Sequence, residues 1–138
     1  MRSALFYLCI VSALICLAST QRNLTGEFRR AHQACQAHSS TRIDEDLMDR
    51  AAAGQPVDEY KLGNHLFCMY LDMGIMSRDK SINRVNLRRQ LRKPVRDEAV
   101  IERIVRNCVP SGVHHGTSQQ IAAELFRCVR RNLPSVSS

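Results

Sequence analysis

The sequence predicts an all-α domain of about six helices. Apolar side chains recur three or four residues apart between short breaks at Gly and Pro, which is the spacing of one helix face. No segment alternates apolar and polar residues with the period of two that is typical of a half-buried strand. A length of 138 residues and a hydrophobic content of 44% suit one globular domain.

The first 20 residues are expected to be a secretory signal peptide. Arg2 gives a positive start, an apolar run extends from Ala4 to Leu17, and small residues follow at Ala18 and Thr20. A membrane anchor is the alternative, but the run is shorter than the ~20 residues that a spanning helix needs. We therefore expect a secreted, extracellular domain over residues 21–138 that does not insert stably into a membrane.

Three helices are expected in the first half of this domain. We place them at residues 24–38, at residues 43–53 and from Asp58 to Gly74. Asp58 is expected to cap the third helix, and Thr41 with Asp44 the second. Short side chains of this kind accept hydrogen bonds from the free N–H groups of a first helical turn.

Three more helices are expected in the second half. Ser81 is a candidate cap for a short fourth helix, and Pro94 suits the first turn of a fifth, which Pro110 breaks. Thr117 starts a sixth helix that Pro134 closes.

Four cysteines remain in the expected mature chain: Cys35, Cys68, Cys108 and Cys128. An even number of cysteines in a secreted protein normally forms disulfides. A zinc site is disfavoured because the gaps of 32, 39 and 19 residues contain no tight pair. Four cysteines allow three pairings, and spacing alone does not choose between them.

The cysteine spacing and the turn after the third helix resemble the insect odorant-binding proteins, which include the pheromone-binding and general odorant-binding proteins. Members usually carry six cysteines, with three residues between the second and third and eight between the fifth and sixth. Here the four cysteines match the first, third, fourth and sixth of that pattern, and the second and fifth fall at Asn64 and Gln119. The run from Cys68 to Asn83, with Gly74 ending a helix, is also similar to the family.

The resemblance implies a disulfide pairing, a fold and a function. The second and fifth cysteines are partners in the family, so the remaining pairs are Cys35 with Cys68 and Cys108 with Cys128, as in the four-cysteine "Minus-C" type. Asn64 and Gln119 should then face each other, and a hydrogen bond between their amides could replace the missing bridge. The implied protein is a compact set of helices around an apolar cavity. It would carry small hydrophobic molecules such as odorants or pheromones reversibly through aqueous fluid.

The residues expected to line this cavity are flexible, aliphatic or aromatic. A Met-rich wall adapts to several ligand shapes, and Tyr70 could anchor a ligand through its hydroxyl. A Leu/Met stripe at helical spacing is usually ordinary core, so the cavity assignment depends on the resemblance. The candidate ligand-binding residues are Phe28, Met48, Leu62, Leu66, Met69, Tyr70, Met73, Met76, Leu91, Ile104, Leu125 and Phe126.

An enzyme is not expected, because hydrolase, phosphate-loop and zinc-protease motifs are absent from the sequence. His32, Cys35 and His38 have a spacing that metal ligands can use, but Cys35 is expected to be oxidised, so we predict neither a metal nor a cofactor. His114 and His115 are expected in a surface loop, with a pH-sensitive role as the alternative.

The net charge of +7 supports a second function class, a secreted cationic effector acting on anionic surfaces such as bacterial envelopes or glycans. A solvated helix face is the ordinary explanation of such clusters. No nucleic-acid partner is expected, because aromatic residues do not interleave with the charges. The expected partners are a small apolar ligand and an odorant receptor, with the chain a monomer or a weak homodimer. The two clusters are Arg88, Arg89, Arg92, Lys93 and Arg96, and Arg127, Arg130 and Arg131.

Overall fold

The computed structural model describes residues 26–112 and 114–134. They form six α-helices, which confirms the predicted fold class. Extended backbone pairs within these residues only at an isolated bridge between Met76 and Ile82. The expected signal peptide, a glycosylation sequon at Asn23 and residues 135–138 lie outside the described residues. The helices are α2 (Gly26–Gln36), α3 (Glu45–Ala52), α4 (Glu59–Asp72), α5 (Arg84–Leu91), α6 (Glu98–Cys108) and α7 (Ser118–Asn132).

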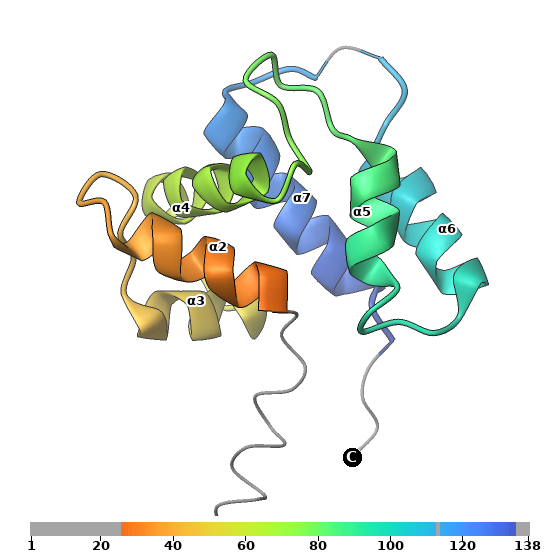
Figure 1. The fold of residues 1–138 in the computed structure, drawn as a ribbon, viewed down its shortest axis with the longest axis horizontal. Helices are drawn as coiled ribbons and strands as arrows, with labels where there is room; N and C mark the ends of the chain where they lie inside the picture. The colour runs from red at the N-terminus through yellow and green to blue at the C-terminus, as the bar shows by residue number, and fades with distance from the viewer. Residues whose placement is uncertain (1–25, 113, 135–138) are drawn as a thin grey trace, which may run out of the picture.

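Helix α7 runs between two groups of helices (Figure 1). Helices α2, α3 and α4 lie on one side of it, and α5 and α6 lie on the other. Its most extensive contact is with α4, and it also contacts α3 and α6. None of the helices in the described part of the chain has the length and apolarity needed to cross a membrane.

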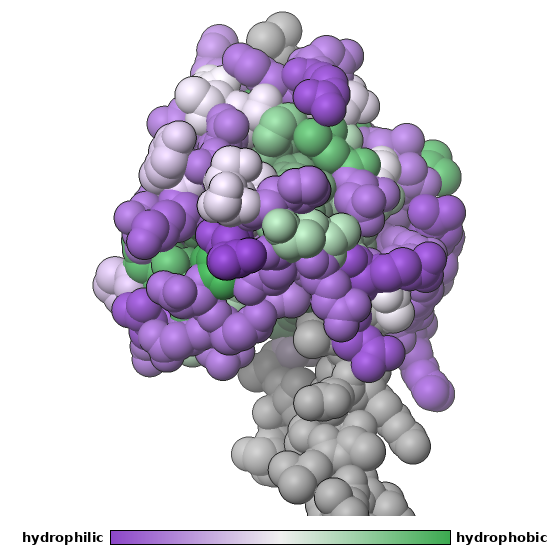
Figure 2. All heavy atoms as spheres, turned by 60° about the vertical axis from the view of Figure 1, so that its left-hand side comes forward, coloured by the Kyte–Doolittle hydropathy of each residue, from purple (hydrophilic) through white to green (hydrophobic). Residues whose placement is uncertain are grey.

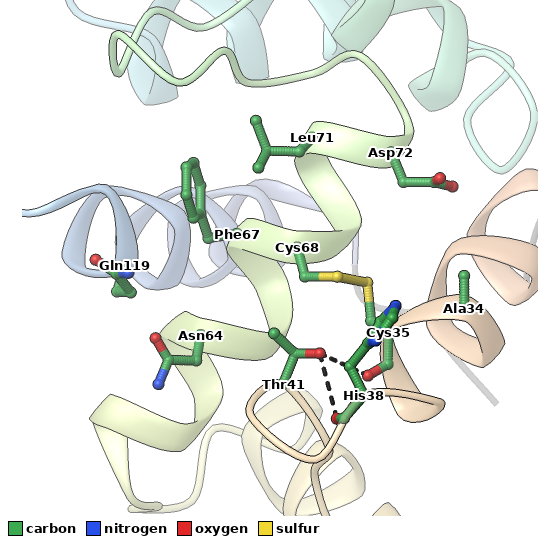
Figure 3. Close-up of a pocket in the computed structure, with 10 residues that line it drawn as sticks. All are labelled: Ala34, Cys35, His38, Thr41, Asn64, Phe67, Cys68, Leu71, Asp72 and Gln119. Carbon is green, nitrogen blue, oxygen red and sulfur yellow. Dashed lines mark hydrogen bonds between the residues drawn. A yellow bond between two sulfur atoms is a disulfide. The ribbon is translucent and has the colours of Figure 1, made fainter.

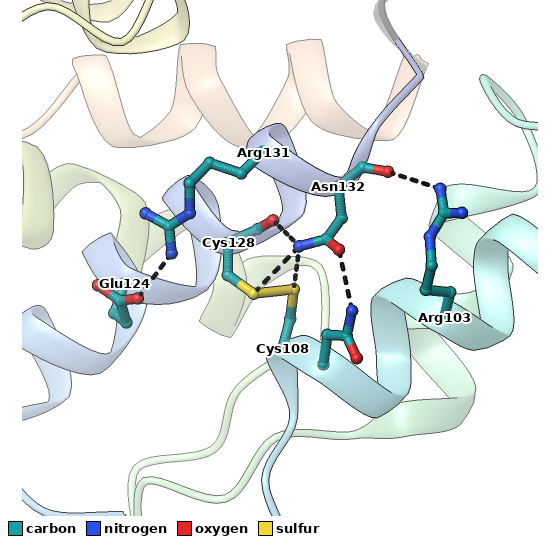
Figure 4. Close-up of a disulfide and its surroundings, with 7 residues drawn as sticks. Arg103, Cys108, Glu124, Cys128, Arg131 and Asn132 are labelled. Carbon is teal, nitrogen blue, oxygen red and sulfur yellow. Dashed lines mark hydrogen bonds and ion pairs between the residues drawn. A yellow bond between two sulfur atoms is a disulfide. The ribbon is translucent and has the colours of Figure 1, made fainter.

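Two disulfides join neighbouring helices, with the pairing that the family resemblance implies. Cys35 of α2 bonds to Cys68 of α4 with 6.0 Å between the Cα atoms, and Cys108 bonds to Cys128 of α7 with 5.5 Å. Around the second bridge, the Asn132 amide donates to the Cys128 carbonyl at 2.8 Å and accepts from Asn107 at 3.0 Å (Figure 4). Closing loops of this size stabilises a fold by about 3–4 kcal/mol per bridge in the chain-entropy model.

Two of the predicted helix starts are confirmed by side-chain hydrogen bonds. The Asp58 carboxylate accepts from the backbone N–H groups of Tyr60 and Lys61 at 3.0 and 3.1 Å. Thr117 and Gln120 form a capping box, in which each side chain bonds the other residue's backbone N–H.

Three other predicted starts are wrong. Asp44 occupies the N-cap position of α3, but its side chain makes no cap bond. Thr41 does not cap the helix either, since its hydroxyl donates to the Cys35 carbonyl at 2.7 Å. Asn83, not Ser81, caps α5, since the Ser81 hydroxyl is held by the Asp79 carboxylate at 2.7 Å. Helix α6 starts at Glu98 behind its cap Asp97, so Pro94 lies in the preceding connection rather than in the first turn.

The core is formed by the facing sides of α4, α6 and α7, joined by apolar residues of the other helices. It includes Leu62, Leu66 and Met69 of α4, Ile101, Ile104 and Val105 of α6, and Ile121 and Leu125 of α7. His65 and Gln90 are the polar side chains buried among the described residues. His65 lies at the edge of the candidate site.

Candidate functional site

A pocket of about 210 Å³ lies between α2, α3 and α7. Phe28 of α2, Met48 of α3 and Phe126 of α7 supply its apolar wall, and each of the three is half-buried. The ring of His32 and the carboxylate of Glu45 form a polar edge. An apolar hollow with few polar groups is the ordinary design of a small-molecule site. The rest of the lining is Arg29, Asp49 and Ala52.

Helical spacing brings these side chains to one place. Phe28 and His32 are four residues apart on α2, so they share one face. On α3, Met48 lies three residues after Glu45 and Ala52 lies seven residues after Glu45, so these three side chains also share one face. The two faces meet through the hydrogen bonds that His32 and Gln36 of α2 make with Glu45 of α3, and α7 supplies Phe126.

Below the polar edge, three side chains form a continuous hydrogen-bonded relay. Glu45 Oε1 lies 2.8 Å from His32 Nε2, and His32 Nδ1 lies 2.8 Å from Nε2 of His65. His65 Nδ1 lies 2.7 Å from the Thr41 carbonyl oxygen. The relay therefore runs from the partly exposed pocket edge to a fully buried ring, and it connects α2, α3, α4 and the 37–44 connection.

The acceptors fix where the hydrogens of this relay are. Because the Thr41 carbonyl only accepts, His65 Nδ1 carries a hydrogen, and because the Glu45 carboxylate only accepts, His32 Nε2 carries another. A neutral His65 with its hydrogen on Nδ1 has a lone pair on Nε2, and this atom faces His32 Nδ1 at 2.8 Å.

The electrostatics agree with this assignment. Burial lowers the pKa of His65, against an opposing effect of its bond to Thr41, which favours the neutral ring. The hydrogen bond from His32 lowers the pKa of Glu45, and a second bond from Gln36 at 3.1 Å adds to the effect. The Glu45 carboxylate at the pocket edge is therefore already hydrogen-bonded, to His32 and to Gln36.

The predicted ligand-binding residues are distributed between this pocket and the core. Phe28, Met48 and Phe126 line the pocket, and Leu125 lines a separate one. The remaining eight are buried in the core, although Met73 also lines a small polar pocket, and all eight stay predictions as ligand contacts: Leu62, Leu66, Met69, Tyr70, Met73, Met76, Leu91 and Ile104. Burial raises the pKa of Tyr70, so its hydroxyl keeps its hydrogen, and within the described residues it makes no hydrogen bond.

A second, more open pocket of about 510 Å³ lies beside the Cys35–Cys68 bridge (Figure 3). Asn64 of α4 and Gln119 of α7 both line it, as the family register implies. The expected hydrogen bond between their amides is absent from the described residues. Instead, α4 approaches α7 through Gly63, where a Cβ atom would lie 2.6 Å from the Gln119 carbonyl oxygen.

A third pocket, of about 430 Å³, contains His114, His115 and Leu125. The two histidines lie in a surface loop, as predicted. The side of the molecule that Figure 2 brings forward is mostly hydrophilic, and apolar surface appears there as small separate patches.

Sequence reasoning missed His65 as part of a site and considered His32 only as a metal ligand. Cys35 forms a disulfide and so offers no thiolate to a metal, and the described ranges contain no group of three potential metal ligands. A signal for His65 was present, since it is a titratable residue between the buried positions Leu62 and Leu66 of one helix face. Its partners could not be found by spacing, because they come from other helices.

Comparison with known proteins gives two findings. The sequence pattern of the PBP/GOBP family matches residues 18–132, which is most of the chain. The chain is also similar to the B1 protein of Tenebrio molitor, with 26% identity over 129 residues that cover 91% of this chain and 95% of that protein.

Proposed function

The chain belongs to the PBP/GOBP family of odorant- and pheromone-binding carriers, and from this premise we propose that it is a secreted protein that reversibly binds small hydrophobic molecules and transports them through aqueous fluid. The observation that carries the proposal is the pocket between α2, α3 and α7. Three residues proposed for ligand binding, Phe28, Met48 and Phe126, meet there although they are far apart in the sequence.

The pocket suits a ligand with an apolar body and one polar group. The rings of Phe28 and Phe126 and the thioether of Met48 offer the body adaptable contacts. The His32–Glu45 pair is the nearest polar feature to which a hydroxyl or carbonyl could bond. A ligand of about ten carbons gains about 8 kcal/mol from burial before ordering costs, so we expect micromolar dissociation constants.

A larger ligand would also need space in the core. Met69 of α4 and Met73, the residue that caps its C-terminus, belong to the core, and we propose that they repack to admit it. Tyr70 is then the proposed anchor, because its side chain is largely buried and its hydroxyl makes no hydrogen bond within the described residues.

The test is displacement of a fluorescent apolar probe from the secreted protein by volatile alcohols, esters and terpenoids. Phe126→Ala should weaken ligand binding about tenfold or more, since truncation removes a large apolar contact. Phe67→Ala is the matched control, because Phe67 is also half-buried but lines the pocket beside the Cys35–Cys68 bridge. Weakening by Phe67→Ala alone would place the ligand there and contradict the proposal.

The same panel separates the carrier from a cationic effector. An effector would bind bacterial envelopes tightly while no small molecule displaced the probe.

We also propose cleavage of a signal peptide near residue 20 and membership of the four-cysteine "Minus-C" type. The N-terminal sequence of the secreted protein tests the first, and thiol titration of the folded protein, which should find no free thiol, tests the second.

A further inference from the structure

The net positive charge of the described residues is concentrated in one part of the structure. Residues 84–108, which comprise α5, α6 and their connection, contain eight basic and three acidic side chains. The other described residues contain ten of each. The α5–α6 unit therefore carries the whole net charge of the described residues, and this asymmetry makes it the part of the structure that attracts anions most strongly.

Two ion pairs cross between α5 and α6 in a regular ladder. Arg92 Nε lies 2.8 Å from Glu98 Oε1, and one turn further on, Arg88 contacts Glu102 with both an Nε and an Nη atom, at 2.7 and 3.1 Å. The residue number rises by four on one helix as it falls by four on the other, so the two helices are antiparallel. The hydrogen bond from Arg88 lowers the pKa of Glu102, which keeps that carboxylate ionised.

The next rung of this ladder contains two arginines instead of an ion pair. One more turn along each helix brings Arg84 of α5 opposite Arg106 of α6, and both line one hollow of about 200 Å³. Glu102 is the acidic residue in its lining and is already bonded to Arg88 on both oxygens. Like charges on facing positions are unfavourable unless an anion lies between them.

The side chains around this hollow offer hydrogen-bond donors to an oxyanion. Arg84 Nη2 donates to the Val109 carbonyl at 2.9 Å, which fixes its guanidinium and leaves its other N–H groups available. Arg106 is exposed and makes no ion pair within 4 Å in the described ranges, although its charge acts on the Glu102 carboxylate one turn away. Ser111 lies in the same lining and offers a hydroxyl donor.

We propose that the Arg84–Arg106 rung is a binding site for a phosphate group, with Ser111 as an additional donor. Guanidinium forks match the geometry of phosphate oxygens, and two of them facing one hollow favour a tetrahedral anion. The group can come from free phosphate or from the headgroup of a phospholipid, whose surface the other cations of α5 and α6 would also attract. The site is separate from the pocket between α2, α3 and α7 and does not depend on its ligand.

The primary test is thermal unfolding of the secreted protein in inorganic phosphate, with chloride keeping the ionic strength constant. The melting temperature should rise with phosphate and reach a plateau. Arg106→Gln should weaken phosphate binding about tenfold or more, because it removes one charged fork. Arg96→Gln is the matched control, since Arg96 is exposed on the same unit but lies outside the hollow. An equal loss in both variants would mean a diffuse positive field and would overturn the site.

A charge reversal tests the ladder itself. Arg106→Glu completes the third ion pair with Arg84, so in phosphate-free buffer this variant should melt above the native protein and should no longer respond to phosphate. Arg96→Glu makes the same change of charge without a facing arginine and should not reproduce the gain. If Arg106→Glu melts no higher than Arg96→Glu, the two arginines do not face each other and the proposal fails.

Vesicles identify the source of the phosphate group. We would compare binding to phosphatidylcholine vesicles with and without phosphatidylglycerol. Binding that depends on phosphatidylglycerol and is lost in Arg106→Gln but kept in Arg96→Gln supports the site with a lipid headgroup as its ligand. Phosphate stabilisation without any vesicle binding supports the site with free phosphate.

Discussion

His65 is a titratable side chain with no exposed surface, and its two ring nitrogens are both used. Its Nδ1 atom lies 2.7 Å from the Thr41 carbonyl oxygen, and its Nε2 atom lies 2.8 Å from His32 Nδ1. Burial favours the neutral ring by lowering the pKa of His65. The relay is therefore a place where pH acts on the contacts among α2, α3 and α4.

The sign of the pH effect follows from that lowered pKa. The unfolded chain takes up a proton at His65 near its ordinary pKa of 6.5, whereas the native protein does so only at lower pH. The free energy of unfolding should therefore fall as the pH drops below about 6.5. The lowered pKa of Glu45 adds a further loss below its ordinary value of 4.5.

A substitution isolates the contribution of His65. His65→Gln keeps a donor for the Thr41 carbonyl but does not titrate, so its unfolding free energy should change less between pH 7.5 and pH 5.5 than that of the native protein. Urea unfolding at the two pH values measures the difference. His38→Gln is the control, because His38 is exposed and outside the relay, and it should keep the native pH response. The same pH response in His65→Gln as in the native protein would contradict the role given to His65.

At the scale of the helices, Gly63 determines how closely α4 crosses α7. A Cβ atom there would lie 2.6 Å from the Gln119 carbonyl oxygen and 2.9 Å from the Gln119 Cβ atom. The obstacle is largely backbone, which cannot move aside as a flexible side chain does. The most extensive helix contact of the fold therefore depends on a residue with low helix propensity.

Gly63→Ala should lower the stability of the protein. Alanine gains about 1 kcal/mol in helix propensity, but overpacking a tight contact costs about 1–3 kcal/mol, and here the helix backbone itself must shift. Thermal or urea unfolding measures the net loss. Gly26→Ala is the control, because a Cβ at Gly26 meets nothing within 4 Å, and its effect should stay within about 0.5 kcal/mol. A stabilised Gly63→Ala variant would show that the crossing is looser than described.

Helix starts show what local sequence can and cannot predict. Asp58 and Thr117 were predicted as caps because each bonds the turn directly after it, which is a local interaction. The prediction of Ser81 as a cap was wrong because the 75–83 segment folds back on itself, with the Asn83 N–H donating to the Ile75 carbonyl at 2.7 Å. That contact, like the bond from Thr41 to the Cys35 carbonyl, depends on residues in other turns.

The candidate site illustrates the same limit across the whole molecule. Phe28, Met48 and Phe126 could be selected by type, and the family resemblance predicted a cavity. Their meeting at one pocket, however, depends on how α7 lies against α2 and α3. Neither the relay through His65 nor the arginine rung of α5 and α6 follows from residue spacing on one helix, because each joins side chains of different helices.

The two disulfides divide the molecule into separately linked parts. One joins α2 to α4, the other joins α6 to α7, and neither links α4 to α7. The candidate pocket lies between α7 and the helices α2 and α3, since its wall combines residues of α2 and α3 with Phe126 of α7. Neither disulfide joins α7 to α2 or α3, so α7 can shift against them and change the pocket, which favours an adaptable site.

A new disulfide would test this relation between linkage and ligand range. Asn64 and Gln119 line the same pocket on α4 and α7, so Asn64→Cys/Gln119→Cys should oxidise spontaneously, which requires Cα atoms about 4.4–6.8 Å apart. The bridge should raise stability by about 2–4 kcal/mol, measured by urea unfolding with and without reductant. It should also narrow the range of ligands that displace the probe, because α7 could no longer move away from α4. Asn64→Ser/Gln119→Ser controls for loss of the amides. Free thiols that persist in the folded double variant would show that the two positions are not neighbours, and an unchanged ligand range in the bridged protein would show that movement at this contact does not shape the site.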